Sequence, residues 1–409
     1  MTRTQAKQLE VIVYTPEPFD GAARYAAEVV KALHTEGIQA SLFCPDNFAY
    51  SEELWGCGVP MSFAPVRDVS RASLFMRIWR NLKFAVRSSL ALHSTMSGGE
   101  CVHFQNPLHF PLGLLPYLVV RLNRGHIILT AHDPIPHRWR LPRYLRAYEM
   151  SMLQQSYRHA DAIVVHNLAG KTALQDTFKV PSNRIHVIPH GPVSSREARS
   201  TYPSFEKLKL LCFGAIRENK GIHLAIEAVQ QLNAQTPIPI ELNIRGELYT
   251  AAEGAYWNSC LRLIERAPLG IDVEEGFVPD EEVGQLFASH HAVLLPYLDF
   301  FSESGVAAMA ISHGRPIIAT NSGGLGEMMT QLECGIPISS PVVADVVDAI
   351  NLVLSCGRDK LEEMGRTGRS HLYLRRSWRM IAERTVEVYS SCQPSRLRRQ
   401  KSSAISAAS

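Results

Sequence analysis

Several signatures that would assign this chain to a class of protein are missing from its 409 residues. It contains no run of about 18 uncharged apolar residues, which excludes a membrane-spanning helix. Its eight cysteines include no C-x-x-C pair, so neither a zinc site nor a redox motif is indicated. No secretory signal with a small-residue cleavage site opens the chain, and we therefore expect a cytoplasmic protein.

Two further absences argue against nucleic acid and against a dinucleotide cofactor as the ligand. The net charge is only +3, which is too small to indicate nucleic acid as a partner. No G-x-G-x-x-G follows the first apolar run, so a NAD-dependent oxidoreductase is not favoured. The content of 46% hydrophobic and 20% charged residues is instead typical of a globular enzyme.

Short apolar runs of strand length, each followed by a turn and a helical segment, form two successive series along the chain. The first series lies at residues 10–14, 40–43, 101–104, 127–130, 162–165 and 185–188, and the second at 208–213, 240–244, 292–295 and 316–320. Several runs are apolar throughout, as parallel strands covered on both faces require. The repeated order of strand and helix predicts the α/β class, with two Rossmann-like, doubly wound parallel-sheet domains.

Helical periodicity and composition predict how the chain is divided. Apolar residues at three- and four-residue spacing predict helices that include 22–35 and 222–232. The expected parts are an N-terminal domain over 1–193, an interdomain linker over 194–207, a C-terminal domain over 208–376, a final helix over 377–392 and a disordered basic tail over 393–409.

The segment FGAIRENKG (213–221) carries the first candidate anion site. A predicted strand runs into Gly214, and Arg217 and Lys220 follow in the turn. Ligands of doubly wound sheets bind beyond the carboxyl ends of the strands. Two cations at that position suit a diphosphate whose negative charge grows as it leaves. The alternative is an ordinary solvated surface turn.

The second candidate lies in SESGVAAMAISHGRPIIATNSGGLGE (302–327). Ser304, Gly305 and Val306 stand between a predicted strand and a predicted helix, whose first amides and dipole attract an anion. A Gly-Gly turn follows at 323–324. Turn chemistry explains each glycine alone, but the group of them at neighbouring strand ends predicts a phosphate site.

These segments resemble the retaining family 4 glycosyltransferases with the GT-B fold, and the resemblance extends over nearly the whole chain. It implies two domains facing each other across a cleft, with the nucleotide sugar held by the C-terminal one. FGAIRENKG is similar to the family's turn whose Arg and Lys hold the diphosphate, and residues 302–327 are similar to its donor loop. GFVPDEEVGQLFASHHAVLLPY (276–297) looks like the stretch whose backbone, at Phe277 and Val278, faces the nucleobase.

The N-terminal half resembles the same family. DGAARYAAEVVKALHTEGIQA (20–40) is similar to its opening glycine loop and helix, which implies that Gly21 lies at the donor cleft. RIHVIPHGP (184–192) resembles the end of its N-terminal domain. SWRMIAERTVEVY (377–389) looks like its last helix, which crosses back to pack on the first domain.

The segment LTAHD (129–133) matches the place where the family keeps a His near the reacting sugar. The resemblance implies that His132 positions sugar hydroxyls, and Asp133 could support it. The alternative is a structural His at a strand end. His103 and His109 flank the neighbouring strand end and are secondary candidates.

The chain departs from the family pattern in the donor loop. The family has two glutamates eight positions apart, one on the transferred sugar and one on the ribose. Counting back from Gly314 places Phe301 and Met309 there, and neither side chain can hydrogen-bond a hydroxyl. Glu303 is the nearest carboxylate and could replace the first. Ala215 also stands where the family often has an Arg, so the resemblance implies a divergent member.

The resemblance implies transfer of a hexose-type unit from a nucleoside diphosphate to a hydroxyl, with retention, in polysaccharide or glycolipid biosynthesis. Arg217, Lys220 and the amides of 304–306 would stabilise the departing diphosphate, whose oxygen could accept the proton of the acceptor. The expected partners are a nucleotide sugar as co-substrate and a glycan or lipid-linked acceptor. No cofactor or metal is expected, and no nucleic acid.

The stretch RASLFMRIWRNLKFAVRSSL (71–90) is basic and amphipathic, and residues 138–146 add cations and aromatics. On a helical wheel Arg77, Arg80, Lys83 and Arg87 gather on one side, with Leu74, Ile78, Leu82 and Val86 opposite. Such a helix fits a peripheral contact with the anionic inner face of the cytoplasmic membrane. An ordinary core helix with a solvated basic face is the alternative.

Two other functions remain open at this point. An inverting transferase or an epimerase on the same fold would need a base, which Asp133 beside His132 could supply. A non-catalytic relative would bind a nucleotide sugar without turning it over. The anomeric configuration of the product and calorimetry with the sugar donor distinguish these functions.

Overall fold

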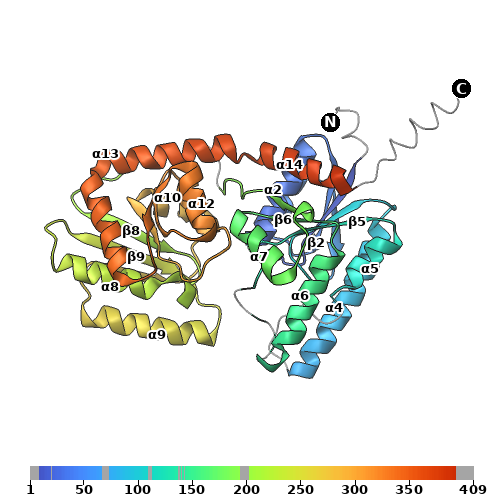
Figure 1. The fold of residues 1–409 in the computed structure, drawn as a ribbon, viewed down its shortest axis with the longest axis horizontal. Coiled ribbons are helices and arrows are strands. Elements are labelled where there is room, and N and C mark those ends of the chain that lie inside the picture. The colour runs from blue at the N-terminus through green and yellow to red at the C-terminus, as the bar shows by residue number, and fades with distance from the viewer. Residues whose placement is uncertain are drawn as a thin grey trace, which may run out of the picture. The chain divides into compact units, whose positions relative to one another are not determined.

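The structure is a computed structural model that describes residues 9–19, 21–66, 73–108, 113–136, 139, 141, 143–193 and 202–392. His109, residues 194–201 of the expected linker and the expected tail over 393–409 lie outside these residues. The chain divides into two compact units, one of Met1–Pro189 with Trp378–Ser409 and the other of His190–Ser377. Each unit contains one parallel sheet covered by helices (Figure 1). The predicted α/β class with two Rossmann-like sheets is confirmed.

The first unit is built on a sheet of order β3-β2-β1-β4-β5-β6-β7. Its strands are β1 (Glu10–Tyr14), β2 (Gln39–Pro45), β3 (Met61–Ala64), β4 (Cys101–Phe104), β5 (His126–Thr130), β6 (Ala162–Val165) and β7 (Ile185–Val187). Its helices are α2 (Gly21–Thr35), α3 (Ser51–Gly56), α4 (Leu74–Thr95), α5 (Leu115–Leu122), α6 (Arg146–His159), α7 (Leu168–Phe178) and α14 (Trp378–Cys392), with short 3-10 turns at Arg143–Leu145 and Ser182–Arg184.

Alternation along the strands gives this sheet a core on each face. In β1, Val11 and Val13 pack with α2 and α14, whereas Ile12 and Tyr14 pack into the cluster formed with α4 and α5. Successive side chains of a strand point to opposite faces, so a strand covered on both sides must be apolar throughout. This explains why β1 and β4 are read correctly from their apolar runs.

The second unit is built on a sheet of order β10-β9-β8-β11-β12-β13. Its strands are β8 (Leu208–Phe213), β9 (Ile240–Gly246), β10 (Ile271–Glu275), β11 (Ala292–Leu295), β12 (Ile317–Thr320) and β13 (Gly335–Ile338). Its helices are α8 (Ile222–Asn233), α9 (Ala251–Arg266), α10 (Asp280–Ala288), α11 (Gly305–Ser312), α12 (Gly323–Leu332) and α13 (Val343–Arg375), with a 3-10 turn at Glu218–Lys220.

The sequence pattern does not predict β3, β10 or β13, and these strands occupy outer positions in their sheets. In β10 every residue is at least partly exposed, and β3 and β13 are each buried at only part of their length. A strand at the edge of a sheet need not be apolar on both faces. Its signal is therefore weaker than that of a central strand.

The short segment after β7 packs with the second unit, although the sequence groups residues 190–193 with the first domain. The amide of His190 donates to Glu303 Oε2 at 2.7 Å, and the amide of Val193 donates to Ser312 Oγ at 3.2 Å. These hydrogen bonds attach the segment to the start and the end of α11. None of the helices that the structure describes is both long and apolar enough to cross a bilayer.

Candidate functional site

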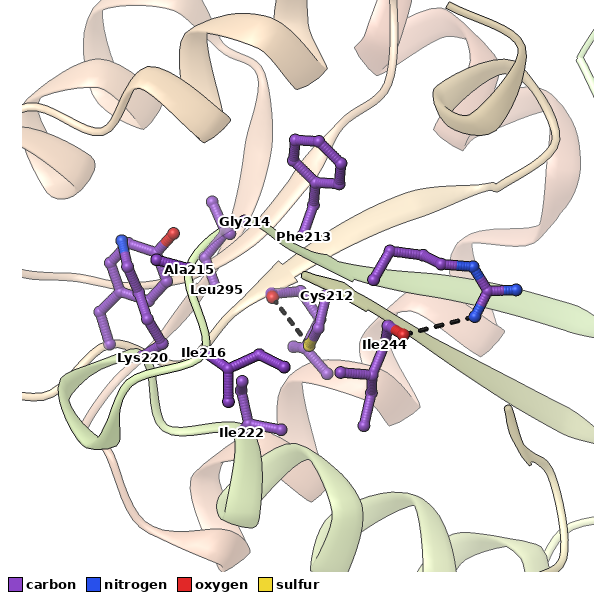
Figure 2. A pocket seen from close by; sticks show the side chains of 12 residues that line it. Cys212, Phe213, Gly214, Ala215, Ile216, Lys220, Ile222, Ile244 and Leu295 are labelled. Atoms are coloured by element: carbon purple, nitrogen blue, oxygen red, sulfur yellow. Dashed lines mark hydrogen bonds between the residues drawn. The ribbon is translucent and has the colours of Figure 1, made fainter. Parts of the chain in front are cut away.

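The carboxyl ends of β8 and β11 lie side by side in the second unit. The chain continues from β8 towards β9 on one side and from β11 towards β12 on the other, which is the topological switch point of a doubly wound sheet. A pocket opens here, lined in part by Gly214, Lys220 and Tyr297 (Figure 2). Its free volume is about 10 Å³, which is room for about one water molecule.

The turn that follows β8, residues 214–221, is shaped by glycine and is called the β8 turn here. Gly214 has φ +100° and Gly221 has φ +64°, both in the region that side chains disfavour. A Cβ on Gly221 would lie 2.0 Å from the carbonyl oxygen of Pro296, and a Cβ on Gly246 would lie 1.9 Å from that of Gly214. The β8 turn therefore packs backbone to backbone against the ends of β9 and β11.

Lys220 ends the 3-10 turn within this segment and lies against an aromatic ring. Its Nζ is 3.8 Å from the ring centroid of Tyr297 and 5.2 Å from that of Phe300. Figure 2 shows the side chain beside Ala215 and Gly214 at the pocket. Cation–π attraction keeps the charge at the strand end without neutralising it, so the ammonium can still bind an anion.

Arg217 is held in a different way, by a carboxylate. Its Nε donates to Glu253 Oε1 at 2.9 Å, and the guanidinium lies 5.9 Å from the ring of Tyr249. The other oxygen of Glu253 accepts the amide of Tyr249 at 2.8 Å. Since the side chain of Arg217 is 45% exposed and a guanidinium carries five N–H donors, it retains donors for a ligand.

The first turn of α11 faces the β8 turn. Ser304 caps the helix, and its Oγ accepts the amide of Ala307 at 3.3 Å. Gly305 is exposed, and a Cβ added there would meet nothing within 4 Å, whereas Val306 comes within 3.3 Å of a Cβ on Gly214. The open end of α11 and the two cations thus belong to one strand-end region, which suits a phosphate group.

The carboxylate of Glu303, which could replace the family's first glutamate, has partners within the second unit. Its side chain is 2% exposed, and Oε1 forms an ion pair with Arg376, itself 3% exposed. The second oxygen accepts the amide of His190, and Arg376 also donates to Gln331 Oε1 at 2.7 Å. The sequence carries no signal for this pair because its members are 73 residues apart.

The backbone expected to face a nucleobase lies next to this region. The amide of Gly276 donates to the carbonyl of Gly246, the residue that touches Gly214. Phe277 then exposes 72% of its surface, whereas Val278 packs against the apolar cluster around α11. The phenyl ring of Phe277 is therefore accessible to a ligand.

In the first unit, His132 follows the end of β5. Its Nδ1 lies 2.9 Å from Nε2 of His166, and its ring forms a T-shaped contact with Tyr25 at a centroid distance of 5.0 Å. Asp133 is exposed, and Gly21 is the exposed first residue of α2. His166 was not among the residues predicted from the sequence, although it directly follows the neighbouring strand β6, as His132 follows β5.

His103 lies in the core and is not a candidate for substrate contact. Its Nδ1 lies 2.6 Å from the hydroxyl of Tyr389, and its Nε2 lies 2.7 Å from Oγ1 of Thr130. Burial lowers the pKa of His103 to about 3. Cys212, which lines the pocket of the second unit, is also inert, because burial raises the pKa of its thiol to about 12.

Comparison with known protein families shows which family this chain belongs to. Residues 19–193 match the family model described as Glycosyltransferase Family 4, and residues 195–371 match the one described as Glycosyl transferases group 1. The chain belongs to the glycosyltransferase family whose two domains these models describe. The two matches leave only residue 194 between them, so the likeness extends through both units of the chain.

Individual curated relatives of this chain are distant. D-inositol 3-phosphate glycosyltransferase of Nocardia farcinica is 26% identical over 249 residues, covering 58% of this chain and 54% of that protein. Glycogen synthase of Mycobacterium tuberculosis is 25% identical over 256 residues, covering 61% of this chain and 58% of that protein. The chain thus spans about half the length of the curated relatives it matches.

Solved structures share the fold of this chain over most of its length. Anabaena Alr3699/HepE, crystallised in complex with UDP, has a TM-score of 0.70 at 15% identity and covers 94% of this chain and 100% of that one. Sucrose-phosphate synthase from Thermosynechococcus elongatus has a TM-score of 0.70 at 17% identity, with 94% and 98% covered. At such identity the likeness establishes the GT-B fold alone.

Proposed function

We propose that this transferase moves a hexose-type sugar from a nucleoside diphosphate to a hydroxyl acceptor, with retention of configuration, in polysaccharide or glycolipid biosynthesis. The observation that carries the proposal is the strand-end region of the second unit. There Lys220 and Arg217 are anchored independently, on a ring and on a carboxylate, beside the open end of α11. The name of the Nocardia relative and the UDP complex of the Anabaena protein are in keeping with it.

The proposed roles of these residues follow from where negative charge develops during the reaction. As the bond from the sugar to the phosphate breaks, charge grows on the diphosphate, and fixed cations and helix amides stabilise it most in that state. We assign this role to Arg217, Lys220 and the amides of 304–306, and the proposal calls on no metal. A departing phosphate oxygen then takes the proton of the attacking hydroxyl, while Phe277 and Val278 border the nucleobase and Gly21 and His132 the sugar.

The first experiment is a thermal-shift screen of nucleotide sugars, followed by kinetics on the sugar donor that stabilises the protein. We expect Lys220→Ala and Arg217→Ala each to lower turnover or donor affinity by about 10²-fold, from loss of a charge-assisted contact to the diphosphate. Lys207→Ala is the matched control, because Lys207 precedes β8 at the opposite end of the strand and pairs with Glu241. Unchanged kinetics in both site variants would remove these cations from the mechanism.

A second function is favoured by one observation, the buried ion pair of Glu303 with Arg376. With that carboxylate buried against Arg376 and with Phe301 and Met309 at the family's glutamate positions, a relative that binds nucleotide sugar without turnover is the competing proposal. Calorimetry that shows donor binding, together with no release of nucleoside diphosphate in the presence of membrane extract, would support it. For an active enzyme, NMR of the product separates retention from inversion at the anomeric carbon.

We also propose that the first unit contacts an anionic membrane through α4, on the inner face of the cytoplasmic membrane. Ile78 and Val86, from the stripe expected to be buried in an ordinary core helix, are each 40% exposed, and Phe75 and Trp79 are 78% and 49% exposed. The buried face of α4 is instead formed by residues such as Phe84. The side chains of Leu74 and Arg77 lie outside the described part of the chain.

Cations accompany this exposed stripe. Lys83 and Arg87 are exposed, and Lys83 Nζ lies 5.3 Å from the ring of Trp79. Apolar side chains beside Lys and Arg suit the boundary between headgroups and acyl chains. We expect Lys83→Ser/Arg87→Ser to weaken flotation with phosphatidylserine vesicles by about tenfold or more. Leu352→Ser, which alters an exposed apolar residue of α13 in the other unit, is the control; equal flotation of both variants would contradict the proposal.

A further inference from the structure

Two histidines of the first unit stand at the ends of neighbouring strands and contact each other. The pairing of β5 with β6 joins Thr130 to Val164, and the same register continued by two residues brings His132 opposite His166. The pairing of β6 with β7 joins Val165 to Val187, and its continuation brings His166 opposite Ile188. The sheet itself therefore aligns these three residues in a row beyond the strand ends.

The row is connected by two hydrogen bonds. Nδ1 of His166 lies 2.9 Å from the carbonyl oxygen of Ile188, and Nε2 of His166 lies 2.9 Å from Nδ1 of His132. Tyr25 places its ring at 5.0 Å from both imidazoles, edge to face. Both rings are thus fixed in orientation by packing as well as by hydrogen bonds.

The carbonyl at one end of the row determines where each proton lies. A carbonyl oxygen only accepts, so Nδ1 of His166 must carry a hydrogen. His166 is 5% exposed, and burial disfavours the charged imidazolium. Its Nε2 is then an acceptor, and Nδ1 of His132 must donate to it. This leaves Nε2 of neutral His132 unprotonated, with its lone pair as the acceptor.

We propose that His166 is a positioning residue that holds His132 in the tautomer whose Nε2 accepts a hydrogen bond, so that His132 recognises a sugar hydroxyl. This rests on the proposed function for the nature of the substrate. A hydroxyl donates to the lone pair of Nε2, whereas a carboxylate at the same place would set lone pair against lone pair. The role of His132 thus depends on the residue aligned with it on the next strand.

The tautomer can be measured without any substrate. In the full-length protein labelled with ¹⁵N-histidine, two-bond correlations show which ring nitrogen of each His carries the proton, and His132→Asn identifies the signals of His132. We expect the proton on Nδ1 of His132 in the unmodified protein. Observation of the proton on Nε2 would overturn the proposal, and this result does not depend on whether the chain is an active transferase.

Two substitutions of His166 test its effect on the reaction. His166→Gln retains a donor and an acceptor in one side chain, whereas His166→Leu retains neither. We expect His166→Leu to lose the tautomer preference and about tenfold or more in kcat, with KM for the sugar donor changed less, and His166→Gln to restore most of both. A folded His166→Leu protein that loses the tautomer preference but keeps its kcat would contradict the positioning role. Absence of turnover in the unmodified protein would count against the proposed function alone.

Discussion

The ion pair between Glu303 and Arg376 places two charges where almost no solvent reaches them. Burying an ion is costly, and the cost is offset only when the partner and further hydrogen bonds satisfy the charge. Here His190 and Gln331 supply those further bonds. Because Glu303 directly precedes the cap of α11, the pair holds the chain that leads into the proposed phosphate site.

At this scale we expect Arg376→Met to lower the free energy of unfolding by about 3–5 kcal/mol, because Glu303 is left as an uncompensated buried charge. The double variant Glu303→Leu/Arg376→Met should recover most of the loss, since it buries no charge. Urea unfolding followed by circular dichroism measures both. Arg379→Met is the control, because Arg379 is exposed and its ion pairs lie at the surface; a loss as small in Arg376→Met as in this control would contradict the argument.

The β8 turn is the element on which the position of both cations depends. It combines two left-handed glycines with close backbone approaches to the neighbouring strand ends, so Lys220 and Arg217 extend from a backbone with little room to move. Nothing but hydrogen fits between Gly221 and Pro296. The element holds the cations in place before any ligand binds, which is the condition for electrostatic stabilisation of a leaving group.

We expect Gly221→Ala to lower the free energy of unfolding by more than about 2 kcal/mol, from the left-handed φ and the overlap with Pro296. It should also weaken binding of the sugar donor, because Lys220 immediately precedes it. Gly254→Ala is the matched control in α9, where a Cβ meets nothing within 4 Å and the helix gains up to about 1 kcal/mol. Thermal unfolding measures the stability of each variant, and calorimetry measures its affinity for the sugar donor. If Gly221→Ala and Gly254→Ala had equal stability and equal affinity, the β8 turn would tolerate displacement and the prediction would be contradicted.

At the scale of the whole molecule, α14, the last helix that the structure describes, belongs to the first unit. α14 packs on α2, and its Ile381, Ala382 and Tyr389 are part of the same apolar cluster as β1 (Figure 1). The hydroxyl of Tyr389 contacts buried His103, which in turn contacts Thr130. The chain therefore passes between the units twice, before His190 and after Ser377.

We expect Tyr389→Ala to destabilise the first unit by about 3–5 kcal/mol, since it removes a fully buried aromatic side chain. Hydrogen exchange should accelerate in residues 10–188 and 378–392, while residues 208–375 retain their protection. Tyr389→Phe, which removes only the hydroxyl, should have a smaller effect of about 1–3 kcal/mol, from leaving His103 without that partner. Equal acceleration in both units would show that they unfold as one.

Much of the fold can be predicted from apolar runs, because central parallel strands are covered on both faces. The runs at 10–14, 101–104, 162–165, 208–213 and 292–295 match strands residue for residue. The outer strands β3, β10 and β13 escape prediction because they are partly exposed. In the site, Arg217 and Lys220 follow a predictable strand end, whereas Glu253, Tyr297 and Arg376 come from distant segments, and their contacts have no local pattern.

The amino-acid sequence by itself determines the two series of strands and helices, the glycines of the β8 turn and the family to which the chain belongs, because each depends on local preference or on motif spacing. Only the tertiary structure decides that Glu303 is an internal partner of Arg376, that His166 lies beside His132, and that part of the apolar side of α4 is exposed. These outcomes depend on which side chains the sheet register and the helix packing bring together, and such contacts join residues tens of positions apart.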